Sequence, residues 1–235
     1  MLLIRIIAIL IICYFIECGI IHNQDDDVEK KSVHHKVKHF VHRRCKLRGH
    51  STRLEEIDRL AEEAKVCFEK PLPHHYTADT VEELREICFE KRKEVIKCFE
   101  RFDNLSTPCF PPEEAYIPAF VTEAYEGYSQ YLCQHIDVLT FSGMLQTNLI
   151  KCLNKFMRHK EYNPQYVCYD NATFVNHTDG TIITKEDLCK DFDLIYDCYE
   201  HQFKEHCPEA PKAWEFQSGL LNGMRAPCRK DNTEE

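Results

Sequence analysis

Two blocks of six cysteines follow one another along this chain with nearly the same spacing. In the first block the last five cysteines are separated by 21, 10, 11 and 24 residues, and in the second block by 21, 9, 9 and 21. The first block comprises Cys45, Cys67, Cys88, Cys98, Cys109 and Cys133. The second comprises Cys152, Cys168, Cys189, Cys198, Cys207 and Cys228. In an oxidised protein, the spacing of the cysteines reflects which segments the disulfides cross-link. The repeat therefore predicts one disulfide-stapled module used twice, with most bonds inside each block.

The N-terminus predicts a secretory signal peptide over residues 1–19. Arg5 precedes an apolar run from Ile6 to Ile16, which is shorter than the roughly 20 residues that a membrane span needs. Cleavage is expected after Cys18 or Gly19, and an uncleaved membrane anchor is the alternative. No later stretch is apolar enough to span a membrane. Loss of Cys13 and Cys18 would leave an even set of cysteines, as a disulfide framework requires.

Other sequence features agree with an extracellular location. Three N-glycosylation sequons begin at Asn104, Asn171 and Asn176. No C-x-x-C pair occurs, so neither a zinc ribbon nor a redox motif is expected. We therefore expect a secreted glycoprotein whose cysteines are structural.

Charge is distributed unevenly along the chain. Residues 19–50 hold eight Lys and Arg against four Asp and Glu, whereas residues 51–235 hold 21 against 34. An acidic body argues against a nucleic-acid partner, because binding to phosphates needs clustered Lys and Arg. The low glycine count, 7 residues, and the 29% of charged residues favour helices over a sheet with many turns.

Residues 20–50 are predicted to form a mobile arm, acidic at first and then rich in His and Lys. His35, His39 and His42 would share one face of a helix and are weak candidates for a Zn²⁺ or Cu²⁺ site, which the neighbouring lysines oppose. The basic run could instead contact an anionic glycan or membrane surface. Arg43 and Arg44 could form a dibasic processing site, which would make the arm a propeptide. A solvated tail without a bound metal or cofactor is the favoured interpretation.

Residues 51–230 are predicted to form an all-α, disulfide-rich bundle of about six helices. Apolar residues recur at three- and four-residue intervals, and Thr80 with Glu83 forms one helix-starting pair. The expected helices cover residues 51–68, 80–102, 113–132, with a kink at Pro118, 138–157, 184–203 and 213–224. At most one short β-hairpin is expected near residues 172–184, around Asp179 and Gly180.

The repeat extends beyond the cysteines. The segment LREICFEKRKEVIKCFERF aligns with KEDLCKDFDLIYDCYEHQF, and each carries two cysteines on an amphipathic helix. This predicts a duplicated helical hairpin, with pseudo-repeats over residues 51–140 and 141–230.

Two segments carry a resemblance to a known family. They read LCKDFDLIYDCYEHQFKEHCPEAPKAWEFQSGLLNGMRAPC and ICFEKRKEVIKCFERFDNLSTPCFPPEEAYIPAF, the latter followed by Cys133 and Cys152. Over roughly residues 55–230 the chain resembles the insect 27 kDa haemolymph glycoprotein family. The arm and the segment from Pro71 to His75 have no counterpart there. The resemblance implies a secreted, helical, cysteine-rich glycoprotein of body fluid, and it brings no catalytic residues.

Catalytic motifs are scarce. His135 and Asp137 lie close to Cys133, as in secreted phospholipases, but the glycine-rich calcium loop of those enzymes is missing. Neither G-x-S-x-G nor H-E-x-x-H occurs. We therefore expect no enzyme, and a secreted hydrolase that uses His135 and Asp137 is the lowest-ranked alternative.

Aromatic residues on the helical faces could form the core or line a cavity for a lipid or hormone. They are Phe99, Phe102, Phe120, Tyr125, Phe141, Phe156, Phe192, Tyr196, Phe203 and Trp214. The sequence thus predicts a secreted binding protein, a haemolymph-type carrier or interaction protein whose partner is an unknown protein or a small hydrophobic ligand. A venom or saliva effector is the alternative.

Overall fold

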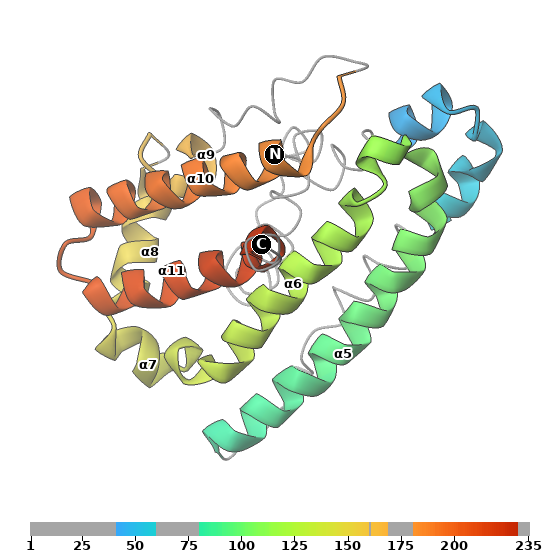
Figure 1. The fold of residues 1–235 in the computed structure, drawn as a ribbon. Helices are drawn as coiled ribbons and strands as arrows, with labels where there is room; N and C mark the ends of the chain where they lie inside the picture. The colour runs from blue at the N-terminus through green and yellow to red at the C-terminus, as the bar shows by residue number, and fades with distance from the viewer. Residues whose placement is uncertain (1–40, 60–79, 160, 169–180, 230–235) are drawn as a thin grey trace. The chain divides into compact units, whose positions relative to one another are not determined.

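The computed structural model describes residues 41–59, 80–159, 161–168 and 181–229 (Figure 1). These residues are helical or irregular and include no strand, so the predicted all-α, disulfide-rich class is confirmed. The signal peptide, the arm before residue 41 and most of the expected hairpin lie outside the described residues. Residues 181–184, at the end of that hairpin, are irregular. Among the helices described, none combines the length and the apolar character that crossing a membrane requires.

The chain divides into two compact units. Of the described residues, 41–59 and 91–122 belong to one, here called the N-terminal unit, and 80–90 and 123–229 to the other, the C-terminal unit. Two long helices, α5 (Val81–Ser106) and α6 (Ile117–Gln134), each contribute to both units.

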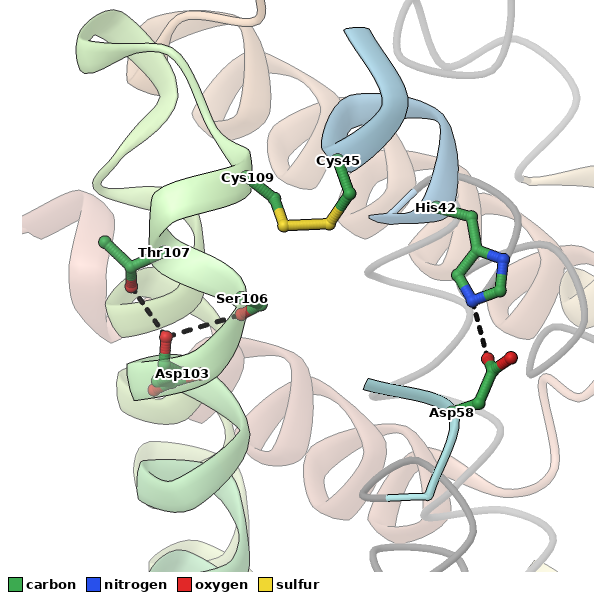
Figure 2. The surroundings of a disulfide bond; sticks show 7 residues. All are labelled: His42, Cys45, Asp58, Asp103, Ser106, Thr107 and Cys109. Atoms are coloured by element: carbon green, nitrogen blue, oxygen red, sulfur yellow. Dashed lines mark hydrogen bonds and ion pairs between the residues drawn. A yellow bond between two sulfur atoms is a disulfide. The ribbon is translucent and has the colours of Figure 1, made fainter. Parts of the chain in front are cut away.

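In the N-terminal unit, the last ten residues of the predicted arm, 41–50, are described, and most of them are folded. Residues 41–47 are helical, and Val41 and Cys45 are buried. Figure 2 shows the Cys45–Cys109 disulfide that holds this helix against η2 (Thr107–Cys109). Arg43 and Arg44 lie within this helix, and Arg44 is buried, so the suggested dibasic site is not an extended, exposed loop. The prediction that residues 20–50 are all mobile is therefore wrong for residues 41–47.

Two of the expected helix starts are confirmed by their caps. At the start of α5, Glu83 N–H donates to Thr80 Oγ1 and Thr80 N–H donates to the Glu83 carboxylate. The same reciprocal pair, Thr184 with Asp187, starts α10 (Lys185–His206). These bonds satisfy amide groups that lack a partner inside the helix.

Two expected helices are broken into shorter pieces. The stretch 113–132 begins as η3 (Pro112–Glu114) and continues as α6, where Pro118 lies in the first turn and no kink is needed. The stretch 138–157 is wrong as a single helix. Its place is taken by η4 (Ile136–Leu139), α7 (Phe141–Gln146) and α8 (Leu149–Arg158).

Asn148 separates α7 from α8. Its φ of 56° lies in the left-handed region, which asparagine tolerates better than most residues and which a continuous helix cannot contain. The Asn148 side-chain amide also donates to Glu209 O at 3.0 Å. A contact with a residue far along the chain therefore fixes the break.

The remaining helices complete the C-terminal unit. They are α9 (Pro164–Val167), α11 (Pro211–Met224) and α12 (Ala226–Arg229). Figure 1 shows α11 beside α10, with α8 next to them. Leu188, Phe192, Ile195, Tyr199 and Phe203 form the buried face of α10.

Helices α6 and α11 touch backbone to backbone at glycines. A Cβ atom built on Gly127 of α6 would lie 2.1 Å from the carbonyl oxygen of Gly223 of α11. One built on Gly219 would meet the ring of Tyr131 at 1.9 Å. Only hydrogen on these Cα atoms permits this close approach.

The two disulfides described in the first block have counterparts in the second block. Each bond that the structure describes joins cysteines of the same block, as predicted. The first and fifth cysteines pair as Cys45–Cys109 and Cys152–Cys207, and the third and sixth pair as Cys88–Cys133 and Cys189–Cys228. In the second block the second and fourth cysteines also pair, as Cys168–Cys198. Cys98 is disulfide-bonded, and Cys67 lies outside the described residues. Shared pairing supports duplication more strongly than spacing does, because it requires the same segments to meet twice.

Candidate functional site

Of the three weak metal candidates, His42 alone lies among the described residues. His42 Nε2 lies 2.5 Å from Asp58 Oδ1, and this contact joins the helical residues 41–47 to residues 54–59 (Figure 2). His35 and His39 lie outside the described residues. Among the residues described, no group of three or more His, Cys, Asp or Glu side chains is placed to hold a metal ion.

The residues of the hydrolase alternative each contact other groups. His135 Nδ1 lies 3.0 Å from Tyr131 O, and its ring stacks on the Tyr131 ring at 4.0 Å. The Asp137 carboxylate lies 3.9 Å from the Arg85 guanidinium. In a catalytic pair of a histidine and a carboxylate, the carboxylate is hydrogen-bonded to the imidazole ring. These two side chains do not form that pair.

A row of aromatic and imidazole rings in the C-terminal unit offers a more coherent site. It joins α8, the loop after it, α10 and α11, and is here called the aromatic cluster. Its members are Phe156, His159, Tyr162, Tyr196, Phe203, His206 and Trp214.

One end of the aromatic cluster is a stack on Tyr162. The Tyr162 ring lies 4.0 Å from the His206 ring and 4.9 Å from the His159 ring, with interplanar angles of 18° and 19°. The buried amide of Asn163 donates to Phe156 O at 2.9 Å, which fixes the loop that carries Tyr162. Lys155 Nζ donates to His206 O at 2.5 Å and ties α8 to the end of α10.

The middle and far end of the cluster lie along α10 and α11. Phe156 and Phe203 meet edge to face at 5.1 Å, and Trp214 lies 5.6 Å from Phe203. Tyr196 meets Trp214 edge to face at 5.5 Å, and the Arg225 guanidinium lies 5.2 Å above the Tyr196 ring. Edge-to-face ring pairs and cation–π pairs are favourable, because each places a positive ring edge or a cation against the negative face of an aromatic ring.

Burial differs along the row. Phe156 and Phe203 are only 4% and 3% exposed, so the middle belongs to the core. Tyr162, Tyr196, His206 and Trp214 are half-buried. The cluster is therefore partly exposed at both ends, while its centre lies in the core.

Two disulfides hold the elements that carry these rings. Cys152–Cys207 joins α8, one turn before Phe156, to the residue that follows His206. Cys168–Cys198 fixes α10 between Tyr196 and Phe203. The rings are thus positioned by covalent links as well as by packing.

Sequence reasoning identified only part of this cluster. The aromatic residues that the sequence suggested for a core or cavity differ in burial. Five are buried: Phe99, Phe120, Phe156, Phe192 and Phe203. Four are half-buried: Phe102, Tyr125, Tyr196 and Trp214. The Phe141 side chain is not among those described. The sequence did not point to four residues of this region: Tyr162, His159, His206 and Arg225. Tyr162 and His159 lie in an irregular loop, and the spacing of the histidines does not by itself indicate that they meet.

A second notable group is the Asp103 carboxylate in the N-terminal unit. Thr122 Oγ1 of α6 donates to Asp103 Oδ2 of α5 at 2.6 Å. Burial raises the pKa of Asp103 to about 6, the Thr122 hydrogen bond opposes that rise, and the nearby Glu100 charge adds to it. Since the folded pKa exceeds the ordinary value of 3.8, the folded state binds more protons than the unfolded state between these two values.

We expect Asp103→Asn to remove part of the pH dependence of stability. In the wild type the contribution of Asp103 is favourable below pH 3.8 and is lost as the pH rises through about 6. At pH 8 the variant should therefore be more stable than the wild type by about 1–3 kcal/mol, and at pH 4 by much less. Urea unfolding of both proteins at the two pH values measures this. An equal difference at both pH values would contradict it.

Comparison with known proteins gives no relative. No family model matches the chain, and no curated protein or solved structure matches it.

Proposed function

We propose that this protein is a secreted, disulfide-rich glycoprotein that acts by binding, as a haemolymph-type carrier or interaction protein for a hydrophobic ligand, and that it catalyses no reaction. The observation that carries this proposal is the aromatic cluster, whose half-buried rings Tyr162, Tyr196 and Trp214 lie on a frame braced by disulfides.

The arrangement of the rings favours binding of an apolar molecule. Partly exposed aromatic rings give a ligand apolar contact area, and Tyr and Trp supply it with few rotatable bonds. The disulfides Cys152–Cys207 and Cys168–Cys198 hold the helices before a ligand arrives. A site ordered in advance loses less conformational entropy on binding.

Secretion is supported by the chemistry of the cysteines. The described disulfides need an oxidising compartment, since the cytosol keeps thiols reduced. The predicted signal peptide and the three sequons point the same way. The resemblance to the haemolymph family adds the expectation of a body-fluid protein.

Trp214 provides a direct test, because it is the only tryptophan in the chain. Titration with a long-chain fatty acid or a sterol should change the emission of Trp214 in a saturable way. Tyr196→Ala should weaken that binding about threefold to tenfold, because an aromatic contact contributes about 0.5–1.5 kcal/mol. Tyr116→Ala, which removes a half-buried ring in the other unit, serves as the matched control and should leave the affinity unchanged.

Native mass spectrometry of the secreted protein complements the titration. A co-purified lipid should appear as a discrete mass increment that Tyr196→Ala reduces. Absence of both a bound molecule and a saturable Trp214 response would reject the hydrophobic ligand. Equal loss of affinity in the Tyr116 and Tyr196 variants would place binding outside the aromatic cluster.

A further inference from the structure

The sequon at Asn104 lies in the last turn of a helix. It covers residues 104–106, and α5 ends at Ser106, whose φ of −84° and ψ of −27° are helical. Asn104 is exposed, whereas Ser106 is 0% exposed. The folded surface can therefore carry a glycan on Asn104, but it hides the hydroxyl that completes the sequon.

Hydrogen bonds hold this turn closed. Ser106 Oγ donates to Asp103 O at 3.4 Å, and Thr107 Oγ1 donates to the same oxygen at 2.7 Å (Figure 2). Both hydroxyls thus bond to the backbone of their own helix end, a common local arrangement for Ser and Thr.

N-glycosylation requires access to the whole sequon. The Asn side-chain nitrogen forms a bond to the anomeric carbon of an oligosaccharide carried on a lipid diphosphate. The bond between that carbon and the diphosphate oxygen breaks, the lipid diphosphate leaves, and the amide proton passes to solvent. The transferase selects asparagines by the Ser or Thr two residues later, so it must reach that hydroxyl. A helical turn with Ser106 buried does not offer it.

The Cys45–Cys109 disulfide helps to hold this turn in its folded position. Cys109 follows Ser106 within one turn, and both cysteines of the bond are 0% exposed. The bond joins this turn to the helical residues 41–47, as Figure 2 shows. Cys45 is synthesised before the sequon, so closure can begin once Cys109 has entered the oxidising compartment.

We infer that Asn104 is glycosylated only before the end of α5 folds and the Cys45–Cys109 bond closes. The glycan is added to the growing chain and then remains exposed on the finished helix. This inference rests on the proposed secretion, but it needs no ligand, so its test is independent of the binding test.

The decisive experiment compares two forms of the unglycosylated full chain as acceptors for the oligosaccharyltransferase of microsomal membranes. One form is refolded and oxidised, and the other is reduced and alkylated. Mass spectrometry of the peptide that contains Asn104 reports occupancy, and Asn104→Gln identifies the signal. An acceptor peptide in each reaction confirms that transfer occurs.

We expect occupancy at Asn104 to be at least about tenfold higher on the reduced chain. Equal occupancy on the oxidised chain would overturn the inference, because the folded turn would then be a substrate. Absence of transfer to Asn104 in either form would also overturn it. In secreting cells, Cys45→Ser should raise Asn104 occupancy wherever the wild type is incompletely modified, whereas a fall would contradict the proposed order of events.

Discussion

Replacement of Glu114 by alanine is expected to lower the free energy of unfolding by about 3–5 kcal/mol. Glu114 is 0% exposed, and its carboxylate accepts a hydrogen bond from Arg44 Nη2 at 2.6 Å. Removing the carboxylate takes from the buried guanidinium the charged acceptor that its Nη2 contacts, and breaking a buried ion pair on one side is costly. The loss should reach the helical residues 41–47 first, because Arg44 belongs to them.

The neighbouring Glu113→Ala is the matched control. Glu113 is exposed and lies in the same short helix, η3, so its loss should change stability by no more than about 0.5 kcal/mol. The double variant Arg44→Met with Glu114→Leu should recover much of the lost stability, because it removes both charges together. Far-UV circular dichroism in urea is the suitable measurement, since it follows helix content in both units, whereas Trp214 lies in the other unit. A loss below about 1 kcal/mol for Glu114→Ala would contradict the burial of the pair.

The features that sequence predicted well are those with local causes. The cap at Thr80 could be recognised because Thr80 and its partner Glu83 lie three residues apart. The block structure of the disulfides could be anticipated because duplication preserves spacing. The connectivity could not, since many pairings satisfy the same spacing.

The errors have long-range causes. The apolar period of residues 138–157 continues through Asn148, so periodicity does not mark the break that the contact with Glu209 fixes. Residues 41–47 were wrongly predicted to be mobile because this segment is rich in charged residues, although three of its side chains are buried in the fold. Val41 and Cys45 are buried, and Arg44 finds its partner Glu114 70 residues away.

The candidate site shows the same limit. Tyr196, Phe203 and Trp214 could be chosen from helical periodicity, but nothing in the sequence relates them to Tyr162. Tyr162 joins the cluster because the loop after α8 folds back to the end of α10, where Cys152–Cys207 holds the two elements together. A site assembled across a disulfide becomes visible only when the pairing is known.

Alanine at Gly127 or Gly223 should also destabilise the protein strongly. In an unobstructed helix, glycine to alanine would stabilise by about 1 kcal/mol, so helix propensity predicts the opposite sign. Here a Cβ at Gly127 would lie 2.1 Å from the carbonyl oxygen of Gly223, and one at Gly223 would lie 2.5 Å from that of Gly127. Backbone cannot rotate away as a side chain can, so α6 and α11 must separate. We expect a net loss of about 3 kcal/mol for either variant.

Two further variants of α11 separate backbone contact from general sensitivity of the helix. Gly219→Ala should cost less, about 1 kcal/mol, because its new methyl group meets the half-buried ring of Tyr131, which can turn. Lys212→Ala, at an exposed position, should be nearly neutral. Trp214 lies on α11, so its fluorescence in urea reports these changes directly. A larger loss of stability for Gly219→Ala than for Gly127→Ala would contradict this prediction. It would mean that side-chain packing, and not contact between the two backbones, sets the distance between α6 and α11.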